Sequence, residues 1–555
     1  MYLSCHIDLN MSRLNTSFYL LIIILVLAAS LRLNHINQPF TDAFSWRQSS
    51  TAMIADNYYR TNWNIFYPEV NWTGPGPNYQ GREFQTVSYI AALMYTVLSP
   101  QDWIGRSISI FFGVWGIFAL YKLIRLVWDE WHAVIGAGVM AVLPGSIFIE
   151  RSFLPDPAMV ALVTTSFWLL IIYLRTESRR YLVFAGVIGA LGFCTKITGL
   201  IVGLPMAYAW MATLGRRRTL SSSKLVALGI FGILTLMPVA LYYLWARHLA
   251  ASFPPHHFAG AGNWLWHDGF RAWWSQNFFW PKLSQRLHDW LWTNPVIILA
   301  TLGLLFPTLT RKHHVMSAPE QRNQHILRKI PWVFHVWLLA GLFYYIIGAK
   351  ELVENPWNLH ILAPPVAALS GHGIVLIAEL FSRILKKFRS GLSFRLHQPV
   401  ILSLTAFLFL FIIMLAGQKG LRWMYFPYAG ESYQLGLALR EVTQPDDLVV
   451  TLANDLGDPV SIFYSQRRGW VFPPAEPGRS WGRLMDDDSE NIRLLTGLRK
   501  SGADWLGIVN EQWQDLGENH SAFMKYIVSI STVESKSKDW IIYRISPPEE
   551  SGKLF

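Results

Sequence analysis

Charged residues are scarce in this chain. Asp, Glu, Lys and Arg make up 15% of its 555 residues, whereas a soluble protein of this length carries about a quarter. Hydrophobic residues make up 52%, and the mean hydropathy is +0.27. This balance excludes an ordinary soluble enzyme and indicates that much of the chain lies in a membrane.

Cysteine is almost absent. Cys5 lies in the N-terminal tail and Cys194 lies inside an apolar segment. Two such positions provide neither a disulfide framework nor the ligand spacing of a metal site. The polar C-terminal part also lacks a G-x-G-x-x-G sequence and a P-loop, so the sequence gives no support for nucleotide binding there.

The basic residues are plentiful but unevenly placed. The net charge is +11, which in a soluble protein is typical of nucleic-acid binding. Here Lys and Arg concentrate in every second loop between apolar segments, as the positive-inside rule requires of cytoplasmic loops. We therefore expect a cytoplasmic N-terminus, an external C-terminus and no nucleic-acid partner.

A bilayer core about 30 Å thick requires about 20 apolar residues per helix. The sequence predicts a mainly α-helical, polytopic membrane protein with about eleven transmembrane helices. The fifth and sixth segments are short and are expected to break around Thr195 and Lys196. The predicted spans are residues 17–36, 106–125, 131–149, 157–174, 181–195, 197–214, 225–246, 295–310, 331–349, 359–381 and 399–416.

These spans divide the chain into a cytoplasmic tail (1–16), a transmembrane domain (17–417) and an external C-terminal region (418–555). Two long loops of the transmembrane domain are expected outside. The first, 37–105, contains amphipathic stretches near 46–60 and 84–98. The second, 247–294, is rich in Trp and suits helices that lie in the interface or contact the substrates.

The C-terminal region has a different composition and is predicted to be a small α/β domain. Its apolar runs at 446–452, 503–509 and 540–545 are typical of strands. Helical patterns near 431–443 and 490–501 precede the first two of these strands. Such a domain either binds a substrate or covers a site on the transmembrane domain.

Acidic residues stand near the external ends of the predicted helices. Asp42 follows the first span, Glu83 precedes the 84–98 stretch, and Glu150 and Asp156 flank the short turn between the third and fourth spans. Ionisable residues beside a membrane are costly and suggest a function. Asp156 has a second interpretation, because Asp before Pro is also a good helix N-cap, and the two roles are compatible.

Several short motifs occur in a characteristic order on the predicted external loops. They are Trp46-Arg47-Gln48-Ser49-Ser50-Thr51-Ala52, Gly81-Arg82-Glu83-Phe84, Gly105-Arg106, Arg151 with Pro155-Asp156, Thr195-Lys196 and Leu359-His360-Ile361-Leu362-Ala363-Pro364-Pro365. This series resembles the bacterial glycosyltransferases of the C fold. That superfamily, similar to glycosyltransferase family 39, contains the protein O-mannosyltransferases and the aminoarabinose transferase acting on lipid A. The similarity is densest over residues 36–200.

The resemblance implies which acids take part, and also where the chain departs from the pattern. Asp42 matches the acid after the first helix, but Ala43 replaces the second member of an Asp-Glu pair. Glu83 matches an acid that the aminoarabinose enzyme follows with a Lys, which here is Phe84. The acids that match are Asp42, Glu83 and Asp156.

The chemistry of an external transferase leads to the same residues. Sugar must arrive on a lipid carrier, whose phosphate requires positive charge from Arg47, Arg82, Arg151 and Lys196. Asp42 is the predicted base on the acceptor hydroxyl, and attack opposite the departing phosphate inverts the anomeric carbon.

Further site residues complete the prediction. Trp46, Gln48 and His360 are expected to line the donor and acceptor pocket. A divalent cation (Mg²⁺, Mn²⁺ or Zn²⁺) held by Glu83 and Asp156 is a further hypothesis.

The sequence therefore predicts an inverting transferase in the inner (plasma) membrane. It would move a sugar from a polyprenyl-phosphate donor to a lipid, protein or polysaccharide acceptor. Two alternatives stay open: a transporter or flippase of lipid-linked sugars, and a ligase or polymerase of glycans. A transporter would show charges or broken helices near the midplane in related halves, and Lys196 has no evident counterpart of that kind.

Overall fold

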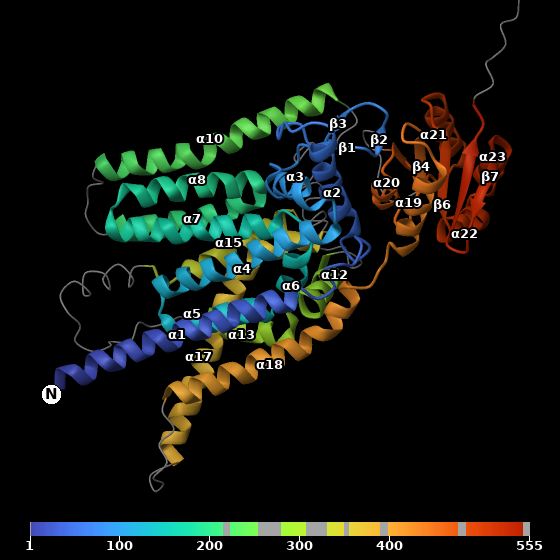
Figure 1. Cartoon of the computed structure of the whole chain (residues 1–555). Helices are drawn as coiled ribbons and strands as arrows, with labels where there is room; N and C mark the ends of the chain where they lie inside the picture. Colours follow the sequence, from blue (N-terminus) through green and yellow to red (C-terminus); the bar gives the residue numbers. More distant parts are fainter. Residues whose placement is uncertain are drawn as a thin grey trace, which may run out of the picture.

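The computed structural model describes residues 2–214, 222–253, 279–306, 330–348, 355–388, 398–474 and 484–547. A bundle of long helices forms most of the molecule, and an α/β domain lies at one end of it (Figure 1). The N-terminal end of the first helix lies at the opposite end of the bundle. The elements of residues 37–105, the first of the two loops predicted to be external, lie between the bundle and the α/β domain.

Each of the eleven predicted apolar segments contains a helix. Among the described residues, five helices are long and apolar enough to cross a membrane, or six when the bent pair α5 and α6 counts as one span. The remaining predicted spans are shorter, so the number eleven stays a prediction. The helices of the bundle are α1 (Tyr2–Arg32), α4 (Asp102–Val127), α5 (Glu130–Val142), α6 (Pro144–Arg151), α7 (Asp156–Thr176), α8 (Arg179–Thr195), η1 (Ile197–Val202), α9 (Gly203–Leu214), α10 (Ser222–Ser252), α12 (Phe279–Gln285), η2 (Arg286–Leu291), α13 (Thr293–Leu305), α15 (Val333–Ile347), η3 (Pro356–Leu362), α17 (Ala363–Phe388) and α18 (Gln398–Met424).

Two breaks in these helices bring polar residues to the site. Between α5 and α6 the chain bends by 64°, because Pro144 cannot donate the backbone hydrogen bond that would continue α5. At Lys196 the backbone is extended (φ −159°, ψ 127°) between α8 and η1, which confirms the break predicted at Thr195-Lys196. A break of this kind frees backbone N–H and C=O groups, which then need other polar partners in a membrane.

Close packing fixes the helices that carry the site. α7 packs against α4 and α8, and α17 packs against α5 and α13. Gly105 on α4 lies under the ring of Phe153, where an added Cβ would stand 2.2 Å from Cδ1. The glycine therefore lets α4 approach the turn before α7.

The first external loop folds into two short helices and three short strands. Both predicted amphipathic stretches are helical: α2 (Ser45–Arg60) and α3 (Thr86–Leu98). β1 (Glu69–Val70) pairs with β3 (Asn78–Tyr79), while β2 (Thr73–Gly74) pairs with a strand of the C-terminal domain. The second predicted loop, 247–294, lies largely outside the described residues, so its proposed contacts with membrane or substrate stay predictions.

The C-terminal domain is an α/β domain, as the sequence predicted. Its sheet has the order β2-β5-β4-β6-β8-β7, in which β4 is parallel to β5 and β6 and the other pairs are antiparallel. The three predicted strands are β4, β6 and β8; β5 and β7 are additional. Its elements are α19 (Gly430–Val442), β4 (Leu448–Leu452), α20 (Val460–Ser465), β5 (Arg468–Val471), α21 (Asp488–Lys500), β6 (Trp505–Val509), α22 (Asn510–Asn519), α23 (Ser521–Ile530), β7 (Ser531–Lys536) and β8 (Trp540–Ile545).

Both faces of this sheet are covered. Val450 and Leu452 pack with side chains of α21 and α23, whereas Val449 packs with α19 and with residues of the first external loop. Because side chains alternate along a strand, β4, in which the last four residues are all buried, has two buried faces. Helix α2 therefore packs against the sheet of the C-terminal domain.

Candidate functional site

Asp42, the acid after α1, is fully buried and shared by two arginines. Its Oδ2 accepts hydrogen bonds from Arg151 Nη1 at 2.6 Å and Arg106 Nη2 at 3.3 Å. Its Oδ1 accepts from Gln48 Nε2 at 2.6 Å and from the Phe44 N–H at 3.3 Å. With both oxygens engaged, this carboxylate orders its neighbours within the fold.

The partners of this carboxylate are anchored in turn to the backbone. Gln48 Oε1 accepts a hydrogen bond from the Phe153 N–H at 3.1 Å. Arg106 Nη1 donates to the Ile36 carbonyl at 3.1 Å, and Arg151 Nη2 donates to the His35 carbonyl at 2.7 Å. The start of α2, the start of α4 and the end of α6 are thereby tied to the loop after α1.

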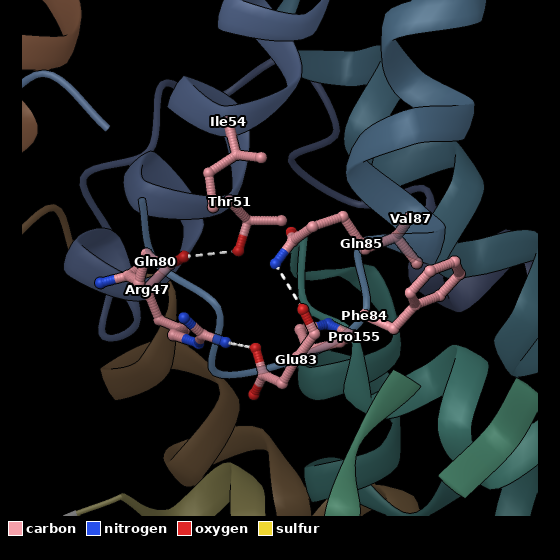
Figure 2. Close-up of a pocket in the computed structure, with 9 residues that line it drawn as sticks. All are labelled: Arg47, Thr51, Ile54, Gln80, Glu83, Phe84, Gln85, Val87 and Pro155. Atoms are coloured by element: carbon pink, nitrogen blue, oxygen red, sulfur yellow. Dashed lines mark hydrogen bonds and ion pairs between the residues drawn. The ribbon is translucent and has the colours of Figure 1, made fainter. Parts of the chain in front are cut away.

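A pocket is lined by residues of α2 and of the segment before α3 (Figure 2). Arg47 on α2 forms an ion pair with Glu83 from the loop before α3, and both side chains line the pocket. The pocket contains about 280 Å³ of empty space, part of it open to solvent. The other lining residues are Thr51, Ile54, Gln80, Phe84, Gln85, Val87 and Pro155.

The segment that carries Arg82 and Glu83 is held through its backbone. The Phe84 N–H donates to the Cys194 carbonyl at the end of α8 at 2.9 Å. The Tyr243 hydroxyl on α10 donates to the Arg82 carbonyl at 3.1 Å, and the neighbouring Tyr242 hydroxyl donates to the Glu83 carbonyl. The Glu83 side chain is therefore presented from a fixed backbone.

Asp156 and Lys196 form a second buried ion pair. Lys196 Nζ donates to Asp156 Oδ1 at 2.7 Å, while Asp156 Oδ2 has no hydrogen-bond partner among the described residues. Asp156 is the first residue of α7, and the helix has no side-chain cap. The N-cap interpretation of Asp156 is therefore wrong. Its carboxylate instead pairs with Lys196, which lies at the break after α8.

The charges around Glu83 act together. Burial raises the pKa of Glu83, but the positive charges of Arg47, Lys196 and Arg82 outweigh it and hold the pKa below its ordinary value. Burial, together with the nearby Arg47, lowers the pKa of Arg82 to about 9. At neutral pH the carboxylate is therefore ionised, and it faces a surplus of cations.

The predicted site residues thus separate into groups. Arg47 and Glu83 line the pocket, the charges of Arg82 and Lys196 act on Glu83, and Asp156 pairs with Lys196. Asp42, Gln48 and Arg151 form the enclosed cluster. Trp46 is half-buried in the first turn of α2.

His360, predicted to line the pocket, lies elsewhere. Its Nε2 is 3.2 Å from Glu150 Oε1, and Glu150 Oε2 in turn accepts from Arg32 Nε at 2.7 Å. All three side chains are buried. They link η3, α6 and α1, so His360 is separate from the residues that line the pocket.

Sequence reasoning missed several contributors. Arg106 appeared only as part of a motif, although it shares Asp42 with Arg151. Gln80 lines the pocket, and a lone glutamine in a loop carries no signal in the sequence. Tyr464 of α20 bonds both the Phe40 N–H and Asp102 across the domain boundary, a contact that no local pattern announces.

The divalent-metal hypothesis gains no ligand set from the part of the chain described. Glu83 and Asp156 are each engaged by a basic side chain. In these ranges no group of three or more His, Cys, Asp or Glu residues converges in a way that could hold a metal ion. These residues alone do not fit a metal centre.

Comparison with known sequences gives one family match. Residues 86–243 match the family described as dolichyl-phosphate-mannose-protein mannosyltransferase. The matched stretch begins at α3 and ends in α10, so it includes Asp156 and Lys196. None of the curated proteins compared with the sequence matches it.

Solved structures share the fold at low identity. The archaeal oligosaccharyltransferase AglB from Archaeoglobus fulgidus, in complex with an inhibitory peptide and a dolichol-phosphate, aligns with a TM-score of 0.58 and 12% identity over 97% of this chain and 75% of that one. The same enzyme in complex with Zn and sulfate aligns with a TM-score of 0.57 and 12% identity, over 94% of this chain and 73% of that one. ArnT from Cupriavidus metallidurans, bound to undecaprenyl phosphate, aligns with a TM-score of 0.54 and 10% identity, over 94% of this chain and 97% of that one.

Proposed function

We propose that this chain is a C-fold glycosyltransferase, similar to the protein O-mannosyltransferases and ArnT, and that it transfers a sugar from a polyprenyl-phosphate donor. The family match over residues 86–243 and the shared fold support the resemblance seen in the sequence. One observation carries the proposal to this chain's own residues: a pocket lined by Arg47 and Glu83, with Arg82 and Lys196 close enough to lower the pKa of Glu83.

The cations of the pocket suit a lipid phosphate. Arg47 is bound by one carboxylate, Glu83, and a phosphate that entered the pocket would compete for it. Guanidinium and phosphate form short, charge-assisted hydrogen bonds. Lys196 adds a point charge from the break after α8. AglB and ArnT have been solved with dolichol-phosphate and undecaprenyl phosphate, which supports the same kind of donor here.

Glu83 is the better candidate for the base. The sequence assigned that role to Asp42, but both Asp42 oxygens are bound inside the fold, whereas Glu83 lines the pocket. When the donor phosphate takes Arg47, Glu83 loses its strongest cationic partner and becomes more basic. We assign Asp42 to the ordering of Arg106 and Arg151.

The reaction then balances within the pocket. The acceptor hydroxyl gives its proton to the Glu83 carboxylate, and its oxygen bonds to the anomeric carbon from the face opposite the phosphate. The bond between the anomeric carbon and the phosphate oxygen breaks, and its electrons leave with the polyprenyl phosphate. Configuration is inverted.

We place the enzyme in the inner (plasma) membrane, with the pocket, the first loop and the α/β domain outside. Five helices of the described chain can cross a membrane, and the α/β domain lies at the end opposite the N-terminal end of α1 (Figure 1). The sugar, whether hexose or pentose, and the acceptor, whether lipid, protein or polysaccharide, are left to experiment. A flippase or a glycan ligase would also bind a polyprenyl-phosphate lipid, but a flippase has no need of a base in the pocket.

The test is mass spectrometry of envelope glycolipids, glycoproteins and polysaccharides from a deletion strain. The strain is complemented with wild type, Glu83→Gln or Asp42→Asn, with membrane levels of each protein measured. We expect one glycan to lose a single sugar in the deletion and wild type alone to restore it fully. Unchanged glycans in the deletion, with the protein normally made in the parent, would instead favour transport of lipid-linked sugars.

A further inference from the structure

The inference concerns Gln80, which lies next to the ion pair of the pocket. The side chain is 2% exposed, and it lines the pocket together with Arg47 and Glu83 (Figure 2). Neither Nε2 nor Oε1 has a hydrogen-bond partner within the described ranges. A buried amide whose donor and acceptor are both unpaired is unfavourable, because it has lost its hydrogen bonds to water and has gained none in the protein.

The other neutral polar side chains of the pocket are all occupied. Gln85 Nε2 donates to the Glu83 carbonyl at 2.7 Å, and Gln85 Oε1 accepts from Ser88 Oγ at 3.2 Å. Thr51 Oγ1 donates to the Arg47 carbonyl at 2.8 Å. Gln80 thus differs from its neighbours in having both a donor and an acceptor to offer.

The position of Gln80 is fixed by its backbone. It follows β3 directly, and its N–H donates to the Pro68 carbonyl at 2.8 Å next to β1. The β1 residue Glu69 is bound in turn by Arg468 of β5 at 2.6 Å. The amide is therefore presented to the pocket from a ribbon that the C-terminal domain holds in place.

We propose that Gln80 recognises the sugar of the donor through a pair of neighbouring ring hydroxyls. This inference rests on the proposed function. An amide donates from nitrogen and accepts at oxygen, and two adjacent hydroxyls supply one acceptor and one donor in return. A site that hydrogen-bonds a substrate hydroxyl discriminates strongly against a ligand without it, because its own polar groups then stay unpaired.

The charges of the pocket define the class of sugar further. Arg47, Arg82 and Lys196 are three cations, against the two carboxylates of Glu83 and Asp156. The phosphodiester of the donor contributes one negative charge, which balances this surplus of one and leaves no net negative charge to pair with an ammonium group on the sugar. The inferred donor carries an uncharged, hydroxyl-rich sugar.

Binding to purified full-length protein in nanodiscs tests the inference. The probes are undecaprenyl phosphate alone, undecaprenyl phosphate carrying a neutral hexose, and undecaprenyl phosphate carrying an aminopentose. We expect Gln80→Met to weaken binding of the hexose lipid on the order of 3- to 10-fold, the effect of one or two neutral hydrogen bonds. Binding of the sugar-free lipid should not change, and wild type should prefer the hexose lipid to the aminopentose lipid.

Thermal unfolding without ligand provides the control. Gln80→Met should melt no lower than wild type, because it removes an unpaired amide, whereas Gln85→Met should melt lower, because Gln85 bonds the Glu83 backbone and Ser88. A wild-type preference for the hexose lipid that survives unchanged in Gln80→Met would overturn the role of Gln80. A wild-type preference for the aminopentose lipid would overturn the sugar class. Absence of any gain in affinity from the sugar in wild type would overturn this inference alone, whereas failure of all three lipids to bind wild type would count against the proposed function as well.

Discussion

Lys196 and Asp156 meet at 2.7 Å in a buried ion pair, although forty residues separate them in the chain. The pair joins the break after α8 to the first residue of α7. Lys196 thereby pairs with an acid at the start of the neighbouring helix, and Pro155, which precedes that acid, lines the pocket. This arrangement makes specific predictions for the two side chains.

Removal of either partner of this pair should be strongly destabilising. Lys196→Met or Asp156→Asn leaves an uncompensated buried charge or dipole, and we expect a loss of about 3–5 kcal/mol of unfolding free energy. The double variant Asp156→Asn/Lys196→Met should lose less than the sum of the single losses. Chemical unfolding in micelles measures all three.

The exposed pair of Arg493 and Glu490 is the matched control, with Arg493→Met expected to cost below about 1 kcal/mol. Strict additivity of the two buried substitutions would contradict the ion pair.

Arg47 should control the acidic limb of the pH–rate profile. Its charge is the largest of those that lower the pKa of Glu83 against burial, ahead of Lys196 and Arg82. A base with a lowered pKa stays ionised as the pH falls and loses its function only below that pKa. Arg47→Met removes the lowering charge, so the acidic limb of kcat/KM should move to higher pH.

Arg82→Met should move the limb in the same direction by a smaller amount, since its charge acts less strongly on Glu83. The measurement is kcat/KM for sugar transfer between pH 4 and pH 9. An acidic limb at the same pH in wild type and Arg47→Met would show that the titrating base is another group.

Asp458 should make the protein less stable as the pH rises. Burial raises the pKa of Asp458 to about 8 from the ordinary 3.8. Between these values the folded protein keeps a proton that the unfolded chain has released, so the unfolding free energy falls with increasing pH up to about 8. Asp458→Asn cannot lose that proton and should melt higher than wild type at pH 8.

The melting temperature measured from pH 5 to pH 9 checks this, and the decline should be flatter in Asp458→Asn. The exposed Asp446 gives the control, Asp446→Asn, whose profile should follow wild type. If Asp458→Asn melts below wild type at pH 8, the carboxylate is ionised in the folded state.

Tyr464 should couple the C-terminal domain to the start of the first loop. Its hydroxyl accepts from the Phe40 N–H at 2.8 Å and donates to Asp102 Oδ2 at 2.8 Å. Tyr464→Phe leaves both groups without this partner, and we expect a loss of about 1–3 kcal/mol. Tyr433 packs on the Tyr464 ring at 4.6 Å and provides the control, Tyr433→Phe, which should stay close to wild type.

Limited proteolysis and thermal unfolding distinguish the two tyrosines. Faster cleavage between α18 and β4 in Tyr464→Phe alone would support the coupling. Equal behaviour of Tyr464→Phe and Tyr433→Phe would mean that the hydroxyl contributes nothing to the domain contact.

The sequence by itself determined the helices, the break at Lys196 and the α/β character of the C-terminal region. Apolar runs are local signals, and a helix satisfies its own backbone in lipid wherever such a run occurs. Strands β4, β6 and β8 were predictable because each is a short run of mostly apolar residues, which is also a local signal. The ordered motifs also predicted the resemblance that the family match over residues 86–243 and the shared fold support.

Tertiary structure decided which of the charged residues meet. Asp42 and Glu83 looked alike in sequence, yet Arg106 and Arg151 enclose the first, whereas the second lines a pocket. Asp156 read as a helix cap until the break after α8 supplied Lys196. The pairing of β2 with β5 likewise joins segments about four hundred residues apart. Such relationships depend on packing between distant elements, and the charges of a buried site are fixed by the partners that packing brings.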